Sequence, residues 1–484
     1  MKILFVASEV APFAKTGGLA DVTGSLPKEL SRLGHDVRIA LPAYREVEKM
    51  ETPVIKMRKS IEVVMGGESY KGYLRHGTLG DVPVYLLENR PLFHRDHLYG
   101  TPEGDYPDNP RRFAFFCRGV LELLKKVDFR PDVIHCHDWQ TALIPYLLRF
   151  DLAGDLFFAR TAVIHTIHNL AYQGHFPRKA LAEMGLDPVH FTIDRLEYYG
   201  GINLMKGAIL TADLVTTVSE TYCREILSPE QGCGLEGVLA LRESDLFGIL
   251  NGLDGDEWNP ATDRVLTKQY GPSSPGGKSA NKKALQRLLG LEERGDVPLL
   301  GMVSRLVAHK GFDLVSELLP RLAAEELQLA VLGTGDARYL AAFAEAREGG
   351  AANISLTVGF DPSMARRIYG GSDIFLMPSH FEPCGLGQLI ALRYGAVPVV
   401  RKTGGLADTV IDSRESAESA NGFSFPGYDA DSLMDAVLRA TSLYRDRQAW
   451  KKLMVQGMKG DFSWRRSAEK YVVLYERAMA KKKR

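Results

Sequence analysis

Three charged side chains in the second half of the chain could act on a phosphate-bearing substrate. Arg305 and Lys310 stand five residues apart in a loop that follows an apolar run. Two cations held in one loop can neutralise a diphosphate as it gathers charge on leaving. The acid Glu382 stands in a turn fixed by Pro383, at the start of the segment around which the chain is organised. The other interpretation of the two cations, that they are solvated surface residues, stays open at this point.

Two glycine-rich turns lie in the same segment, each next to an apolar run. The first extends from Cys384 to Gly387 and the second from Thr403 to Gly405. Glycine lets a ligand approach the backbone, and the unpaired N–H groups at a helix start favour an anion such as a pyrophosphate. Ordinary turns between strands and helices also use glycine, so either turn alone is a weak signal.

The second of these turns is repeated near the N-terminus. Residues 15–21 and 402–408 have the same sequence, Lys-Thr-Gly-Gly-Leu-Ala-Asp, and each copy precedes a helical pattern. Two halves that carry the same turn indicate two similar layered domains facing one ligand, although convergence of local loops could produce part of the match.

A histidine-rich strand end suggests a metal site as a competing hypothesis. His135 and His137 alternate on one face of a predicted strand, and Asp138 follows. Histidine and carboxylate are common metal ligands. The alternative is a histidine packed in the sheet and an aspartate that binds a ligand hydroxyl, and no later His/Asp series completes a metal site. His168 follows another strand, and the chain contains no Gly-x-Ser-x-Gly nucleophile motif.

The elements expected to hold these residues alternate between strand and helix. Ile3–Ala7 is apolar throughout, as in a strand covered on both faces. Apolar residues then recur every three or four positions over residues 19–33, which indicates a helix, and Asp36–Leu41 is another strand. Strand, glycine turn, helix and strand form a βαβ unit. Further strands are expected at 82–87, 132–136, 161–167 and 213–218, and in a second series at 299–303, 327–332, 354–358, 373–377 and 397–400.

The predicted fold class is therefore α/β, with two doubly wound domains and a cleft between them. Polar residues cluster just past the C-terminal ends of the predicted strands, the edge where open α/β sheets bind ligands. The turn-rich segment 251–254 is followed by residues with little regular pattern, which places the domain boundary near residue 250. We expect domains at 1–250 and 251–460, with a last helix inside 461–484.

Composition argues against several classes of protein. Sixty Lys and Arg balance sixty Asp and Glu, so nothing favours nucleic acid or an anionic membrane as a partner. The apolar N-terminal run is too short for a signal peptide, and no stretch approaches the roughly 20 apolar residues that span a bilayer. Five cysteines form no Cys-x-x-Cys pair, which fits a reducing compartment. The expectation is a cytoplasmic protein whose oligomeric state the sequence leaves open.

Taken together, these motifs resemble the bacterial glycogen synthase and plant starch synthase family. They follow the family's order along the chain at 15–22, 137–139, 168–174, 250–254, 304–311, 382–386, 403–408 and 461–464. The resemblance implies a glycosyltransferase-B fold of two Rossmann-like domains, with the C-terminal helix crossing back to the first. It also implies retaining transfer of glucose from ADP-glucose to the non-reducing end of an α-1,4-glucan such as glycogen, with no metal or other cofactor.

The resemblance implies a role for each matching residue. Arg305, Lys310 and Lys15 would hold the diphosphate, and Glu382 would bind the glucosyl hydroxyls and stabilise a developing oxocarbenium ion. His168 would lie against the sugar, and Asp138 and Asn251 would line the acceptor and glucosyl pocket. The expected catalytic residues are Glu382, His168, Arg305, Lys310 and Asp138. The expected substrate-binding residues are Lys15, Gly18, Asp21, Asn251, Lys282, Phe360, Cys384, Gly385, Leu386, Thr403, Gly404 and Gly405.

At Phe360 the chain departs from the family, which often has tyrosine there. A phenyl ring can still stack on a base but lacks the hydroxyl.

Retention normally needs a carboxylate nucleophile on the opposite face of the sugar. No second acid clearly fits, so the front-face route that the resemblance implies, in which the leaving phosphate takes the acceptor proton, is favoured. The alternatives are the same fold with UDP-glucose or another acceptor, a non-catalytic glucan- or nucleotide-binding protein, and a metal hydrolase built on His135, His137 and Asp138.

Overall fold

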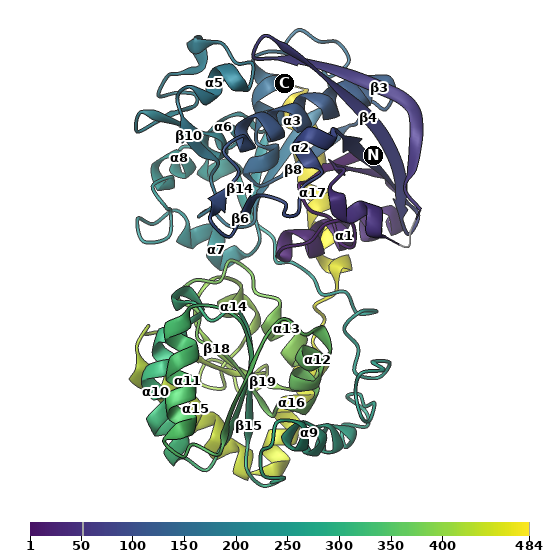
Figure 1. The fold of residues 1–484 in the computed structure, drawn as a ribbon. Coiled ribbons are helices and arrows are strands. Elements are labelled where there is room, and N and C mark those ends of the chain that lie inside the picture. Colours follow the sequence, from purple (N-terminus) through teal and green to yellow (C-terminus); the bar gives the residue numbers. More distant parts are fainter. Residues whose placement is uncertain (51–52, 484) are drawn as a thin grey trace. The chain divides into compact units, whose positions relative to one another are not determined.

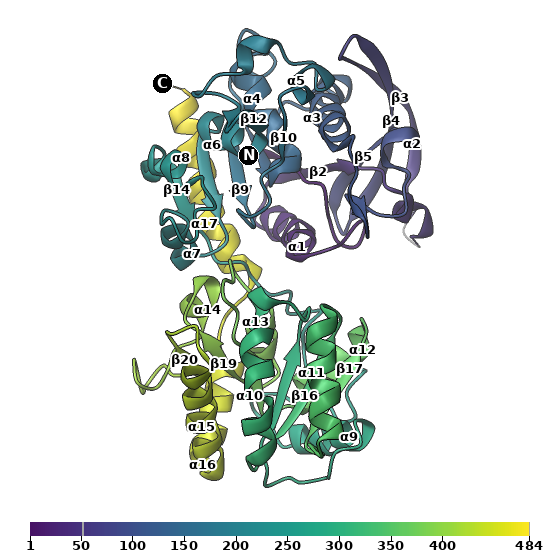
Figure 2. The same ribbon diagram turned by 60° about the vertical axis from the view of Figure 1, so that its left-hand side comes forward.

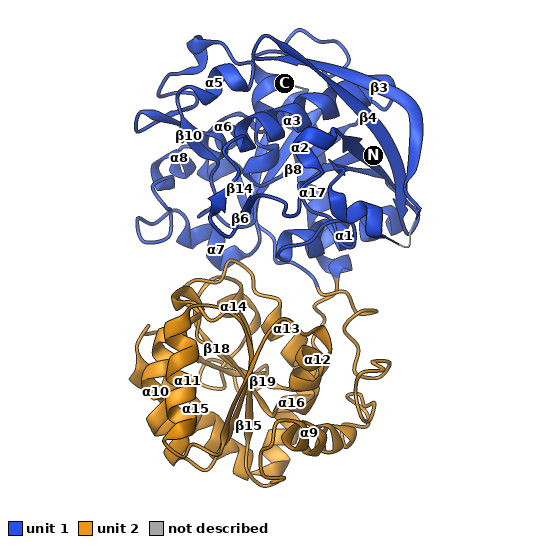
Figure 3. Ribbon diagram, in the orientation of Figure 1, with its two compact units in different colours: residues 1–252, 464–484 blue, residues 253–463 orange. Residues whose placement is uncertain are grey.

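The computed structural model describes residues 1–50 and 53–483. The chain divides into two compact units, shown in blue and orange in Figure 3. Unit 1 consists of residues 1–252 together with 464–484, and unit 2 of residues 253–463. Among the described residues, no helix is long and apolar enough to cross a membrane.

Unit 1 is built on a nine-stranded sheet with the strand order β14-β13-β9-β8-β1-β2-β5-β4-β3. The seven strands from β14 to β5 pair in parallel, and β4 and β3 continue the sheet antiparallel. The parallel strands are β1 (Lys2–Val6), β2 (Asp36–Pro42), β5 (Val82–Glu88), β8 (Val133–His137), β9 (Ala162–Ile167), β13 (Leu214–Thr217) and β14 (Leu246–Gly248).

The antiparallel hairpin of β3 (Ile55–Met65) and β4 (Glu68–Leu79) was not predicted from the sequence. Most side chains of β3 are exposed, so the strand carries no continuous apolar run of the kind that revealed the buried strands. Smaller sheets are formed by β10 (His175–Pro177), β11 (Glu197–Tyr198) and β12 (Gly201–Asn203), and by β6 (Gly100–Thr101) and β7 (Gly104–Asp105).

Helices cover the sheet of unit 1, and one of them is formed by the C-terminal segment of the chain. The helix α17 (Trp464–Lys482), predicted from the sequence and yellow in Figures 1 and 2, packs against α1 (Gly18–Arg32) and β9. Its buried face, which includes Tyr471 and Tyr475, belongs to the same apolar core as β1 and β2. The remaining helices are α2 (Arg90–Phe93), α3 (Asn109–Lys126), α4 (Leu143–Arg149), α5 (Ala180–Glu183), α6 (Leu204–Thr211), α7 (Glu220–Glu225) and α8 (Glu236–Ala240).

Unit 2 is built on a six-stranded parallel sheet with the order β17-β16-β15-β18-β19-β20. The strands are β15 (Leu299–Val303), β16 (Gln328–Gly333), β17 (Ile354–Val358), β18 (Ile374–Met377), β19 (Val397–Arg401) and β20 (Phe423–Phe425). The helices are α9 (Gly277–Leu288), α10 (Phe312–Ala324), α11 (Ala337–Glu348), α12 (Pro362–Gly371), α13 (Gly387–Arg393), α14 (Gly404–Thr409), α15 (Ala430–Arg445) and α16 (Arg447–Met458). In Figure 1 helices lie on both faces of this sheet.

Both units share the doubly wound strand order. Counted along the chain, the parallel strands of unit 2 have the order 3-2-1-4-5-6, and those of unit 1 have the order 3-2-1-4-5-6-7. The order reverses between the first and fourth strands, and ligands of such sheets bind beyond the carboxyl ends of the strands at that point. The α/β fold class with two doubly wound domains is confirmed. The switch points lie between β1 and β8 in unit 1 and between β15 and β18 in unit 2.

Candidate functional site

One group of candidate residues follows β1, at the switch point of unit 1. The turn at residues 15–18 leads into α1, and Lys15 forms an ion pair of 2.5 Å with Asp21 on the first turn of that helix. Burial raises the pKa of the Asp21 carboxyl, and the hydrogen bond from Lys15 opposes that rise. A Cβ on Gly17 or Gly18 would meet no atom within 4 Å, so the backbone here is open to a ligand.

A buried carboxylate that the sequence analysis missed holds this turn in place. Glu9 is 4% exposed, and its carboxylate accepts hydrogen bonds from the backbone N–H groups of Thr16 (2.5 Å) and Gly17 (3.2 Å). The hydroxyls of Thr16 and Tyr99 also donate to it, each at 2.7 Å. An isolated glutamate in a loop gives no motif. The only available signal was its place between the first strand and the glycine turn.

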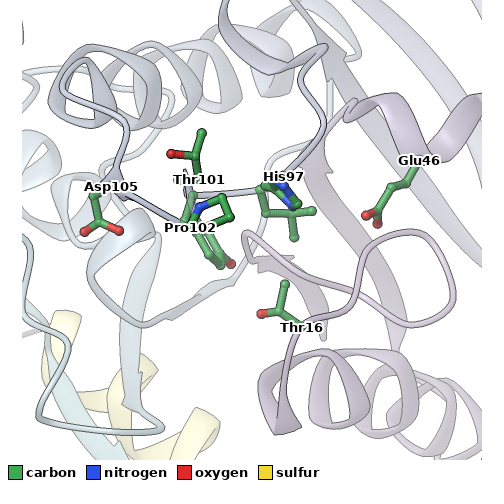
Figure 4. Close-up of a pocket in the computed structure, with 9 residues that line it drawn as sticks. Thr16, Glu46, His97, Thr101, Pro102 and Asp105 are labelled. Atoms are coloured by element: carbon green, nitrogen blue, oxygen red, sulfur yellow. The ribbon is translucent and has the colours of Figure 1, made fainter. Parts of the chain in front are cut away.

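A pocket of about 330 Å³ adjoins this turn (Figure 4). Thr16 and Tyr99 line it, so the network around Glu9 forms part of its wall. The rest of its lining consists of Glu46, His97, Leu98, Gly100, Thr101, Pro102 and Asp105.

On the other side of the same switch point, Asp138 and His168 come together. Asp138 follows β8 with a positive φ of 55°, which is unusual for a residue with a side chain. Its carboxylate accepts a hydrogen bond of 2.7 Å from the backbone N–H of His168, after β9. Burial raises the pKa of Asp138 to about 7 and lowers that of His168 to about 3, so the imidazole is neutral at physiological pH.

The histidines proposed as metal ligands have other partners. His135 contacts the hydroxyls of Tyr475 (2.9 Å) and Thr166 (2.6 Å), and Nδ1 of His137 lies 3.0 Å from Nε2 of His168. Within the described parts of the chain, no group of three or more His, Cys, Asp or Glu side chains is arranged to hold a metal ion.

A second group of candidate residues joins two loops of unit 2 at its switch point. Lys310, after β15, and Glu382, after β18, form a part-buried ion pair of 2.6 Å. The Ser379 hydroxyl donates to the same carboxylate oxygen at 3.0 Å. Arg305, in the loop of Lys310, is exposed. A carboxylate and two cations thus stand where a doubly wound sheet binds ligands.

A glycine makes the approach of these two loops possible. Gly311 has a φ of +81°, and a Cβ there would lie 2.2 Å from the carbonyl oxygen of Pro378. The backbone N–H of His380 donates to the carbonyl of His309 at 2.9 Å, and the ring of His309 stacks on Phe381. These contacts fix Lys310 beside Glu382.

The second glycine turn packs directly on the segment that carries Glu382. A Cβ on Gly404 would lie 2.0 Å from the Glu382 carbonyl oxygen, and one on Gly405 would lie 2.1 Å from that of Cys384. The Gly405 N–H donates to the carbonyls of Glu382 and Pro383, so it is not free for a phosphate. Thr403 and Cys384 are buried. Gly385 adopts a φ of +71°, and Leu386 is the N-cap of the short helix α13.

Three of the expected residues lie outside these two groups. Lys282 on α9 is 3% exposed, and its ammonium contacts Asp373 (2.7 Å), the Tyr444 hydroxyl (2.8 Å) and the Val297 carbonyl. This buried network gives the Lys282 ammonium a structural role within unit 2. Phe360, after β17, is 93% exposed. Asn251 is buried in unit 1, and its side-chain oxygen has no hydrogen-bond partner among the described residues.

Comparisons with known proteins agree with this geometry. A family model described as "Starch synthase catalytic domain" matches residues 2–241, and one described as "Glycosyl transferases group 1" matches residues 290–453. The chain is 64% identical to a glycogen synthase of Geotalea uraniireducens over 100% of both chains. It is 62% identical to glycogen synthase 2 of Geobacter sulfurreducens over 99% of both. The catalytic domain of starch synthase IV from Arabidopsis thaliana, solved with ADP and acarbose, matches with a TM-score of 0.89 and 36% identity over 99% of both chains.

Two Rossmann-like units, each with polar residues at its switch point, define a glycosyltransferase of the GT-B fold, a hexosyltransferase. Within that class, the chain belongs to the glycogen synthase and starch synthase family.

Proposed function

We propose that the chain transfers glucose from ADP-glucose to the non-reducing end of an α-1,4-glucan, with retention at the anomeric carbon and release of ADP. The observation that carries the proposal is the pair of Lys310 and Glu382, with Arg305 nearby, at the switch point of unit 2. Support for the nucleotide and the glucan comes from the starch synthase IV relative, which was solved with ADP and acarbose.

In the donor half, Arg305 and Lys310 balance the charge of the leaving diphosphate. Glu382 binds glucosyl hydroxyls and stabilises positive charge that develops at the anomeric carbon. Phe360, which is exposed, offers a face for the base to stack on. The domain at 251–460 is thus the nucleotide-sugar domain of this proposal.

In the acceptor half, unit 1 binds the glucan. Asp138 and Asn251 line the sugar pocket, and His168 lies against the transferred glucose. Lys15 and Gly18 add contacts to the donor phosphates through an ammonium and an open backbone. The pocket beside Thr16 and Tyr99 has an apolar lining with polar side chains such as Glu46 and Asp105, which suits the faces and hydroxyls of further sugar rings of the glucan.

The mechanism we favour is a front-face displacement in which the leaving phosphate takes the proton of the acceptor hydroxyl. Asp138 is a buried acid of the acceptor half, but its carboxylate accepts the His168 N–H and its pKa is about 7. About half of this group is protonated at neutral pH, which makes it a poor covalent nucleophile. The cations Arg305 and Lys310 supply the charge stabilisation, so the proposal includes no metal or cofactor. Five unpaired cysteines fit a reducing, cytoplasmic setting.

The test is transfer of radiolabelled glucose to glycogen from ADP-glucose and from UDP-glucose, in wild type and in Lys310→Ala. We expect transfer from ADP-glucose that is unaffected by EDTA and collapses in the variant. Transfer from UDP-glucose alone would overturn the donor, and no transfer from either would overturn the activity. Loss of activity in EDTA that Zn²⁺ or Mg²⁺ restores would contradict the metal-free mechanism.

A further inference from the structure

His137 is a buried titratable residue that the mechanism above does not use. Its side chain is fully buried at the carboxyl end of β8, and its Nδ1 lies 3.0 Å from Nε2 of His168. Its own Nε2 is buried and has no hydrogen-bond partner in the described chain. His168 has no protein partner for its Nδ1 among the residues described, and its ring is only partly buried.

The ring of His137 is clamped in position by its neighbours. The backbone N–H of His137 donates to the Thr141 hydroxyl at 2.7 Å, and that hydroxyl donates to the His137 carbonyl at 2.8 Å. The ring of Phe5 stacks on it at a centroid distance of 5.4 Å, and the ring of His135 lies 4.2 Å away. The nitrogen that His137 presents to His168 is therefore set by packing.

The orphaned nitrogen decides which ring donates in the shared hydrogen bond. Burial keeps both imidazoles neutral, so each has one N–H and one bare nitrogen. If His168 donated from Nε2, His137 would carry its proton on its own Nε2, as a buried N–H without an acceptor. Buried N–H groups without a partner are rare and costly, whereas a bare lone pair is tolerated better. The proton of His137 therefore belongs on Nδ1, where it is donated to His168.

We propose that His137 is a positioning residue that fixes His168 as the Nδ1–H tautomer and thereby turns its free nitrogen into a hydrogen-bond donor for an oxygen of the transferred sugar. The role in catalysis rests on the proposed function, whereas the tautomer itself does not. A neutral imidazole of the opposite tautomer would present a lone pair there and could only accept from a sugar hydroxyl.

The tautomer can be measured without any activity. In protein labelled with ¹⁵N-histidine, the ¹⁵N resonances of His168, assigned with His168→Gln, should show a protonated Nδ1 and an unprotonated Nε2 at neutral pH. The reverse pattern, or a doubly protonated ring, would overturn the proposal. This measurement stands even if no variant of His137 folds and even if the proposed sugar transfer is wrong.

Two variants separate the hydrogen bond from the packing. In His137→Asn the side-chain nitrogen can take the place of Nδ1 and donate to His168, whereas His137→Phe keeps a ring but has no donor. We expect the Phe variant to lose affinity for ADP-glucose by roughly 10- to 100-fold, as for one lost hydrogen bond to a buried group, with unchanged affinity for ADP. The Asn variant should recover most of that loss.

A matched control is His165→Phe. His165 is also fully buried, on β9, but its Nε2 faces the sulfur of Met205 rather than His168. The same ring substitution there should leave the ratio of ADP-glucose affinity to ADP affinity unchanged. Equal loss of ADP binding in His137→Phe, or an Asn variant no better than Phe, would show that His137 acts through packing alone and would overturn the proposal.

Discussion

The same seven residues form a turn in each unit, and the two copies are held by opposite means. In unit 1 the carboxylate of Glu9 accepts from Thr16 and Gly17, and the glycines face open space. In unit 2 the turn lies against the segment 382–384, and the main-chain carbonyl of Glu382 accepts from Gly405. The glycines are thus needed for access in one unit and for close packing in the other.

The difference also separates the two glutamates. Glu9 uses its side chain to hold a turn, so its carboxylate has no oxygen to spare for chemistry. Glu382 holds its turn through the backbone, which leaves the carboxylate for Lys310. Identical turn sequences therefore do not imply identical roles. The group that supports each turn decides which acid can act on a substrate.

The largest expected effect is on the catalytic rate, and it tests whether the Glu382 carboxylate acts on the substrate while its backbone carbonyl holds the turn. Glu382→Gln removes the negative charge but keeps the backbone carbonyl on which the turn depends, so kcat should fall by a factor on the order of 10³ while stability changes little. Initial rates with ADP-glucose and glycogen, together with calorimetric unfolding, check both expectations. A variant that unfolds early would mean that the carboxylate itself supports the turn. Near-normal kcat would remove Glu382 from the mechanism.

Packing in unit 2 predicts the next largest effect. A Cβ at Gly405 would overlap the Cys384 carbonyl oxygen, so Gly405→Ala should lower the unfolding free energy of unit 2 by about 3 kcal/mol. Denaturant unfolding followed by the fluorescence of Trp258 and Trp450, with the tryptophans of unit 1 replaced, measures this. Unchanged stability would show that the turn can move away from residues 382–384, and the comparison of the two turns would fail.

Features that depend on neighbouring residues in the chain could be predicted from the sequence, whereas contacts between distant segments could not. Apolar runs revealed the buried strands, and the Lys310 and Glu382 loops could be chosen because each follows such a run. The contact between them could not be read, because it depends on Gly311 meeting Pro378 across two strands. The pair of His137 and His168 likewise needs the register of β8 and β9, in which His137 lies opposite Thr166.

The structure also differs from the sequence-based expectations at Glu9 and at Lys282, where the sequence contains no distinctive pattern. Glu9 was overlooked because a single acid in a loop has no characteristic spacing, and its role appears only when Thr16 and Tyr99 converge on it. Lys282 was expected at the substrate because it resembles a lysine in the second domain of the family, and its burial could not be predicted from the sequence. Its partner Asp373 directly precedes β18, about 90 residues further along the chain, so no local sequence pattern could indicate this contact.

Asp138 in unit 1 and Glu382 in unit 2 should also differ in how they make the unfolding free energy depend on pH. Among the described residues, no cation pairs with the Asp138 carboxylate as Lys310 pairs with Glu382, and burial raises the pKa of Asp138 to about 7. The folded state therefore holds this proton more tightly than the unfolded state, so stability falls as pH rises from about 4 to 7. Between pH 5 and 8 wild type should lose about 2.5 kcal/mol more unfolding free energy than Asp138→Asn. Parallel pH profiles for the two proteins would contradict the raised pKa.

Removal of the Glu9 carboxylate, which holds the turn at residues 15–18, should mainly lower the affinity for ADP. In Glu9→Ala four polar groups lose their acceptor, which should weaken ADP binding by roughly 30-fold, or about 2 kcal/mol, as the turn loses its shape. Calorimetric titration with ADP measures it. The control is Lys402→Ala in the other turn, whose pair with Glu415 is exposed and worth little. Equal ADP affinity in both variants would show that the shape of the first turn does not matter.

The smallest expected effect is that of a substitution at Gly18. It distinguishes a glycine needed for ligand access to the backbone from one needed for close packing, as at Gly405. A Cβ at Gly18 would meet nothing within 4 Å, and Gly18 begins α1, where alanine is the better helix former. Gly18→Ala should therefore raise the stability of unit 1 by about 0.5 kcal/mol, the opposite sign to Gly405→Ala. ADP binding should weaken all the same, because the added methyl occupies space that a phosphate needs in order to reach the backbone. If Gly18→Ala is stabilised and binds ADP as wild type does, the open turn is not a phosphate cradle, and only the cations of unit 2 hold the diphosphate.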